Sequence, residues 1–187
     1  MSATNAIKLW TLEDFFEWQQ TVDDRYELVD GFPLKMMTGA SRRHDTVVMN
    51  ILGELRNRLR GKPCIPFTAD GAVETRPGQI RRPDVGVDCG PTDPDAFTAS
   101  EPAVVFEVLS PSTRDFDRLR KIGEYKAMPF LRHIVLLEQD KPIALLWSRI
   151  AGPHWDEQRI EGLNETLPLP AIGIELPLRE LYDRVLS

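Results

Sequence analysis

A single carboxylate interrupts an apolar run near the middle of the chain. Glu107 stands inside AVVFEVL, residues 103–109, whose β-branched and aromatic residues predict a strand buried on both faces. Burying an ionised carboxylate costs on the order of several kcal/mol unless a cation or hydrogen-bond donors meet it. We therefore expect Glu107 to lie either in a metal site or in a buried ion pair with Lys121 or Arg82.

A second acid precedes Glu107 by 23 residues. Asp84 follows Pro83, and the alternation after it places Asp84, Gly86 and Asp88 on one face of a strand. A proline belongs at the start or edge of a strand, which puts Asp84 near a sheet margin. If the two strands pair side by side, Asp84 and Glu107 form a hard oxygen site suited to Mg²⁺. Pro-Asp is also an ordinary turn opener, so Asp84 alone has a structural explanation.

The segment after Glu107 carries a positive charge at helical spacing. Asp117, Lys121 and Tyr125 are four residues apart and share one face of a predicted helix. That face could cover the acids, where Lys121 would hold a water or meet the charge of a phosphate in the transition state. The alternatives are a surface pair between Lys121 and Asp117, and a core tyrosine with a hydrogen-bonded hydroxyl.

The elements that must position these residues form a mixed order of strands and helices. Periodicity and capping signals predict both kinds of element, and Asp30-Gly31 predicts a two-residue hairpin. Helices are expected at 11–20, 43–60, 114–128 and 178–185, and strands at 25–29, 32–37, 69–75, 80–88, 103–109, 133–138, 143–148 and 155–160, with a Pro-rich stretch at 167–177. This order indicates an α/β (α+β) domain with one core.

Composition sets outer limits on function. With 187 residues the chain is expected to form one domain, 11–187, after a flexible N-terminal leader, 1–10. The N-terminus lacks the order of a signal peptide and no apolar run reaches 18 residues, so we expect a cytoplasmic protein without a membrane partner. Cys64 and Cys89 are far apart in sequence and are expected to be reduced.

The formal net charge of −6 argues against a protein that binds polyanions over its whole surface. It leaves room for a local basic groove, for which a solvated helix face is the alternative explanation. The cations concerned are Arg81, Arg82, Arg114, Arg118, Arg120, Lys121 and Lys126.

In these motifs the chain resembles the Uma-two family of endonucleases, within the PD-(D/E)XK nuclease superfamily. The matching segments are Pro83-Asp84, FEVLSPST at 106–113, the helical set of Asp117, Lys121 and Tyr125, and, upstream, YELVDG at 26–31 with His44. Individually these motifs are short, but together and in this order they are specific. They cover nearly the whole chain, from about Thr11 to Leu186.

The resemblance implies a restriction endonuclease-like fold: a central mixed β-sheet flanked by helices, with extra N-terminal and C-terminal hairpins. It also implies a metal site, with Asp84, Glu107 and the Val108 carbonyl as ligands. The superfamily's usual lysine, two residues after the second acid, would fall at Leu109. The family lysine lies on the next helix instead, which corresponds to Lys121.

Two upstream residues enter the site through the same resemblance. Glu27 would hold a water of the metal or pair with Lys121, unless it is only an exposed strand residue. His44 would support the site, unless it is a helix-end histidine satisfied by backbone. With Tyr125 these side chains would complete the catalytic set.

We therefore predict a metal-dependent endonuclease that hydrolyses DNA with Mg²⁺, for which Mn²⁺ would substitute. A homodimer is expected by analogy with nucleases that cut both strands. One alternative is a catalytically weak nuclease-fold module that binds DNA or a protein partner. The other is a carboxylate-pair hydrolase of small molecules, which a deep enclosed pocket would favour.

Overall fold

The computed structural model describes residues 9–36, 40–109 and 115–186, with the backbone alone for 115–118. Its largest layer is a six-stranded sheet in the order β10-β9-β8-β7-β6-β3. β7 and β8 are parallel and the other neighbours are antiparallel, so the sheet is mixed. The strands are β3 (Ile65–Thr68), β6 (Val85–Asp88), β7 (Pro102–Leu109), β8 (His133–Glu138), β9 (Ile143–Ala151) and β10 (His154–Glu161).

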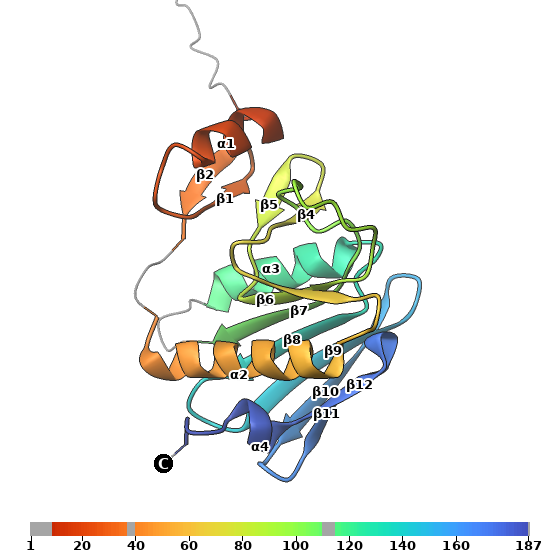
Figure 1. The fold of residues 1–187 in the computed structure, drawn as a ribbon. Coiled ribbons are helices and arrows are strands. Elements are labelled where there is room, and N and C mark those ends of the chain that lie inside the picture. The colour runs from red at the N-terminus through yellow and green to blue at the C-terminus, as the bar shows by residue number, and fades with distance from the viewer. Residues whose placement is uncertain (1–8, 37–39, 110–114, 187) are drawn as a thin grey trace, which may run out of the picture.

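β7 lies inside this sheet, and apolar cores cover both of its faces. Val104, Phe106 and Val108 face the core that contains α2 (Arg42–Arg58). Val105 and Leu109 face the core that contains α3 (Asp115–Ala127). Figure 1 shows the two helices on opposite sides of the sheet. The predicted strand buried on both faces is confirmed, and its alternation directs Glu107 toward the side of α3.

A smaller sheet with the order β2-β1-β5-β4 lies beside the first. Its strands are β1 (Tyr26–Val29), β2 (Phe32–Lys35), β4 (Val73–Arg76) and β5 (Gln79–Arg81). Asp30 and Gly31 both have positive φ, 52° and 80°, which a two-residue hairpin turn with right-handed strand twist requires. The predicted hairpin is confirmed. Helix α1 (Leu12–Gln19) packs Phe15 against Leu28 and Ile80 of this sheet.

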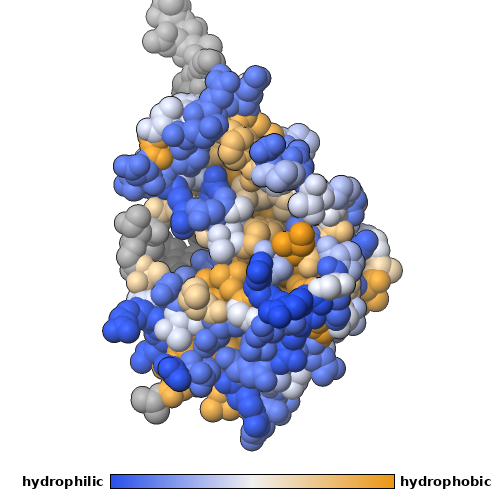
Figure 2. Space-filling model, viewed as in Figure 1, coloured by the Kyte–Doolittle hydropathy of each residue, from blue (hydrophilic) through white to orange (hydrophobic). Residues whose placement is uncertain are grey.

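The C-terminal segment closes the face of the large sheet that α2 covers. β11 (Thr166–Leu169) and β12 (Ile174–Pro177) form the expected C-terminal hairpin around the short helix η1 (Pro170–Ile172). The final helix, α4 (Leu178–Leu181), is shorter than the predicted 178–185. In Figure 2 apolar residues gather in the middle of the visible face, between the region around α1 at the top and a hydrophilic lower part.

Three expectations about the chain are wrong. The predicted strand 80–88 is two strands in different sheets, because Pro83 interrupts the backbone ladder between β5 and β6. The predicted strand 69–75 is confined to β4. Cys64 and Cys89 form a disulfide: β3 and β6 pair antiparallel with Ile65 opposite Asp88, so the cysteines at their ends face each other.

The start of the chain falls only partly within the described residues. Residues 1–8 of the expected leader lie outside them. Trp10, also assigned to the leader, is held in the fold, since its backbone N–H donates to the Gly31 carbonyl at 2.9 Å. In the described part of the chain, no helix is long and apolar enough to cross a membrane.

Candidate active site

Strand pairing brings the two predicted acids together. β6 and β7 pair antiparallel as far as Val85 opposite Phe106, and Asp84 and Glu107 are the residues that come next to this last pair. Val85 and Phe106 both face the core of α2, so the alternating neighbours, Asp84 and Glu107, share the other face.

Asp84 is held from two directions. Its Oδ2 accepts the Val108 backbone N–H at 2.7 Å, and His44 Nε2, in the first turn of α2, lies 3.3 Å from the same oxygen. The hydrogen bond to Asp84 raises the pKa of His44 above its ordinary value, against the opposing effect of burial. Within the described residues, His44 Nδ1 is buried without a hydrogen-bond partner. His44 therefore contacts the acid, not only helix backbone.

Pro83 cannot donate a backbone hydrogen bond to the Val108 carbonyl. The β6–β7 ladder ends at Val85, two residues after Pro83. A residue in an extended strand points its N–H and C=O to the same side, so the Val108 carbonyl also faces the side of Asp84. Proline has no N–H to donate. Pro83 therefore does not compete for this carbonyl.

Glu107 is contacted by the two helical residues that the spacing predicted. Tyr125 OH donates to Glu107 Oε1 at 2.7 Å, and Lys121 Nζ lies 3.6 Å from the same oxygen. The Glu107 side chain is 16% exposed, and its burial raises the pKa to about 7, with Lys121 opposing this effect and Asp84 adding to it. The pair with Lys121, one of the two expected explanations for Glu107, is present.

Lys121 bridges Glu107 and the N-terminal hairpin. Its Nζ lies 3.1 Å from Glu27 Oε1 in β1. Burial alone would lower the pKa of Lys121, but the carboxylates of Glu107 and Glu27 outweigh it and raise the pKa. The hairpin reaches the site, and Glu27 is buried there rather than exposed. Leu109, at the position of the superfamily's usual lysine, packs in the core of α3.

Two cations expected to line a groove are buried instead. The Arg81 side chain is 0% exposed, and it binds Glu27 through Nη1 at 2.8 Å and Glu124 through Nε at 2.6 Å. The Arg82 guanidinium donates to the backbone carbonyls of Tyr26 and Asp70. Both side chains are buried and bound to protein oxygens, so they do not form an exposed basic surface.

Glu124 is a site neighbour that the sequence did not reveal. It accepts two hydrogen bonds from Arg81 and one from Arg120, which also binds Asp30 of the hairpin turn at 2.6 Å. Its spacing of three residues from Lys121 was the available signal. These contacts tie α3 to the smaller sheet.

The site therefore unites most of the predicted residues around one oxygen pair. Among the described residues the contacts form two adjacent sets: Asp84 with Val108 and His44, and Glu107 with Tyr125, Lys121 and, through Lys121, Glu27. The predicted segment 110–114 and the side chains of Asp117 and Arg118 lie outside the described residues.

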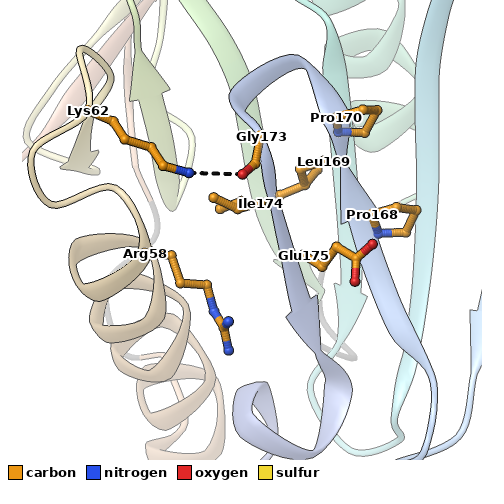
Figure 3. Close-up of a pocket in the computed structure, with 8 residues that line it drawn as sticks. All are labelled: Arg58, Lys62, Pro168, Leu169, Pro170, Gly173, Ile174 and Glu175. Carbon is orange, nitrogen blue, oxygen red and sulfur yellow. Dashed lines mark hydrogen bonds between the residues drawn. The ribbon is translucent and has the colours of Figure 1, made fainter.

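A pocket elsewhere contains none of these side chains. It lies between the C-terminal end of α2 and the β11–β12 hairpin, where Lys62 Nζ donates to the Gly173 carbonyl at 2.9 Å (Figure 3). Arg58 also lines it and is paired with Glu54 and Glu180. His44, which contacts Asp84, and Arg58, which lines the pocket, are fourteen residues apart, or about 20 Å along α2.

Comparison with known proteins identifies the family. Residues 12–179 match the Uma2 family, described as "Putative restriction endonuclease". The chain belongs to this family. Two relatives of the Uma2 chain occur in Synechocystis sp. (strain ATCC 27184 / PCC 6803 / Kazusa): the uncharacterized protein slr1290 is 26% identical over 172 residues, and the uncharacterized protein sll1609 is 24% identical over 168. The alignments cover 91% and 88% of this chain, and 90% and 94% of the relatives.

A solved structure has the same fold as this Uma2 chain. The crystal structure of a "putative nuclease belonging to DUF820" from Anabaena variabilis ATCC 29413 superposes with a TM-score of 0.73. The match covers 94% of this chain and 99% of the other, at 14% sequence identity. With the mixed sheet and flanking helices, this confirms the predicted restriction endonuclease-like fold.

Proposed function

We propose that this Uma2 protein is a Mg²⁺-dependent endonuclease that hydrolyses DNA phosphodiester bonds, with Mn²⁺ as an effective substitute. The observation that carries the proposal is that Asp84 and Glu107 come next to the last β6–β7 pair, with a buried lysine bound to Glu107. Membership of a family of restriction endonucleases supports the nuclease reaction. DNA as the substrate and Mg²⁺ as the metal are our own extension.

The available oxygens suit a hard divalent cation. Asp84 uses Oδ2, and Glu107 uses Oε1, for the contacts described above, which leaves Asp84 Oδ1 and Glu107 Oε2 outside them. In the described part of the chain, no three His, Cys, Asp or Glu side chains group together to hold a metal. A structural zinc site needs four such ligands, whereas Mg²⁺ binds one or two carboxylates and keeps several waters.

The Val108 carbonyl would be the third protein ligand. It faces the same side as the N–H that holds Asp84, and Pro83, just before β6, has no N–H that could compete for it. A bound divalent ion would supply Lewis-acid polarisation of the phosphate and a lower pKa for a water nucleophile.

The protein's own side chains would orient the reacting groups and balance their charge. Lys121 presents a fixed positive charge beside Glu107, suited to holding the attacking water or to meeting the negative charge that builds on the phosphate. Tyr125 holds Glu107 in place through Oε1, and His44 holds Asp84 through Oδ2. Glu27 fixes the direction of Lys121 from the opposite side.

The test combines metal binding with cleavage of supercoiled plasmid. Wild type, Asp84→Asn and Glu107→Gln are titrated with Mg²⁺ and Mn²⁺ by calorimetry and then assayed for nicking at saturating metal. Asp140→Asn is the control, because Asp140 is an exposed acid in the β8–β9 turn. We expect both site variants, and not the control, to lose metal binding and cleavage. Metal binding without cleavage of any nucleic acid tested would favour the alternative, a nuclease-fold binding module.

A further inference from the structure

Arg81 is a buried cation near the site that binds two carboxylates, Glu27 and Glu124. Its guanidinium binds Glu27 through Nη1 at 2.8 Å and Glu124 through Nε and Nη2 at 2.6 and 2.9 Å. The Arg81 side chain is 0% exposed, whereas the side chains of Glu27 and Glu124 are 5% and 12% exposed. One cation thus joins β1 and α3 through β5.

Both carboxylates that Arg81 binds are connected to Lys121. Glu27 Oε2 binds Arg81, while Glu27 Oε1 lies 3.1 Å from Lys121 Nζ and accepts the Arg82 N–H at 3.0 Å. Glu124 lies one helical turn beyond Lys121 on α3, so its contact with Arg81 fixes the helix itself. Arg81 therefore contacts both the helix that carries Lys121 and the carboxylate that pairs with the Lys121 amine.

The planar fork of arginine is needed for this arrangement. Three donors of one guanidinium reach two carboxylates in different directions, with two parallel hydrogen bonds to Glu124. An ammonium group is a point charge without this geometry. A buried carboxylate that loses its partner also costs free energy until it moves or takes up a proton.

We propose that Arg81 is a positioning residue that sets the place of the Lys121 amine beside Glu107, acting through Glu27 and Glu124. The inference rests on the proposed function, because the lysine that Arg81 positions is assigned there to the hydrolytic reaction. Loss of Arg81 removes the contact on Glu27 Oε2 and one of the ties on α3, and leaves the Arg82 N–H on Glu27 and the Arg120 contact with Asp30. Lys121 then keeps its charge but loses its location, and a displacement of about 1 Å at a catalytic group costs about 10²-fold in rate.

The first test is a double-mutant cycle on Arg81→Met and Glu27→Gln. Turnover of plasmid is measured at saturating metal, and metal affinity is measured by calorimetry. We expect Arg81→Met to lower kcat by about 10²-fold with metal affinity changed less than threefold. If Arg81 acts through Glu27, the double variant should lose little more than the worse single variant. Losses that multiply, or an unchanged kcat in Arg81→Met, would overturn the inference.

The second test reads the position of Lys121 without any cleavage. Lysines are labelled briefly with acetic anhydride and quantified by mass spectrometry, with exposed Lys141 as the internal reference. The Lys121 side chain is 16% exposed and ion-paired twice, so labelling should be slow in the wild type. We expect Arg81→Met to raise the rate at Lys121 several-fold and to leave Lys141 unchanged. Unchanged labelling of Lys121 in folded Arg81→Met would refute the positioning role.

Arg58→Met is the matched control. Arg58 also binds two glutamates, Glu54 and Glu180, but at the far end of α2. Its loss should leave kcat and the labelling of Lys121 unchanged even if stability falls. Should Arg81→Met not fold, Glu27→Gln and Glu124→Gln each remove one of its contacts, and unchanged Lys121 labelling in both would overturn the inference.

The two tests separate this inference from the proposed function. A wild type that cleaves nothing, combined with faster labelling of Lys121 in Arg81→Met, rejects the nuclease proposal and keeps the positioning role. A wild type that cleaves, combined with unchanged labelling of Lys121 in Arg81→Met, keeps the nuclease proposal and rejects the positioning role.

Discussion

The substitution Glu107→Gln should stabilise the metal-free protein at neutral and alkaline pH. Burial raises the pKa of Glu107 from an ordinary value of 4.5 to about 7. Each pKa unit corresponds to about 1.4 kcal/mol, so ionised Glu107 costs the folded state up to about 3 kcal/mol relative to its neutral form. Glutamine has the shape of the neutral acid and can still accept the Tyr125 hydroxyl. The variant should therefore be more stable by up to that amount.

The pH dependence has a defined sign. The folded state holds the Glu107 proton more tightly than the unfolded state, so wild-type stability from this group is lost as pH rises from about 4.5 to about 7. Below this window the variant and the wild type should differ little. Above pH 7 the difference should be constant at its maximum. For a chain of this size, about 3 kcal/mol corresponds to a shift in Tm on the order of 10 °C.

Urea denaturation in EDTA at several pH values from 4 to 8.5 measures the difference directly. Adding Mg²⁺ should then stabilise the wild type by mass action and leave Glu107→Gln unchanged, which reverses or narrows the gap. A variant that is less stable than the wild type at pH 8 in EDTA would refute the reasoning. It would mean that the pair with Lys121, at 3.6 Å, holds the fold together more strongly than burial opposes it.

Three further substitutions test other parts of the site. Lys121→Ala should lower kcat by about 10²–10³-fold, while metal affinity, measured by calorimetry, stays within threefold. The control is Lys126→Ala, whose lysine lies over the Trp147 ring, and it should leave both kcat and metal affinity unchanged. Equal activities of the two variants would remove the role given to Lys121. Pro83→Ala adds a backbone N–H just before β6 that can compete for the Val108 carbonyl, so it should weaken Mg²⁺ binding about tenfold, whereas unchanged calorimetric affinity would exclude that carbonyl as a ligand. His44→Gln should lower stability in EDTA most below pH 6.5 and progressively less as pH rises through the raised pKa of His44; urea titrations with a constant difference at all pH values would contradict the contact with Asp84.

Local patterns in the sequence were enough to place the acids and the helix that faces them. The run of β-branched residues around Glu107 permits burial on both faces, and the pairing of Val85 with Phe106 then brings Asp84 to the same end of the two strands. The spacing of four between Lys121 and Tyr125 needs no tertiary information, because a helix places both on one face. Both side chains do contact Glu107.

Contacts between elements distant in sequence could not be predicted this way. Arg81 pairs with residues 54 and 43 positions away, and no periodicity within β5 distinguishes a buried arginine from one on a groove. The disulfide was missed for a related reason: Cys64 and Cys89 face each other only because β3 and β6 pair in one register. The break at Pro83 was visible in the sequence, but its assignment to a strand start did not reveal that two sheets part there.

The location of the lysine explains why the smaller sheet belongs to the site. On a strand, the residue two positions after Glu107 would be fixed beside it by the backbone, but that residue is Leu109, packed with Ile122 and Tyr125 of α3. A lysine on a helix is held only by its long side chain and by the packing of that helix. Its position must therefore be fixed by other groups, and the contacts that do so come from Glu27 and, through Glu124, from Arg81 of the smaller sheet. In this chain the hairpin is thus a structural requirement of a lysine that approaches the acids from the helix.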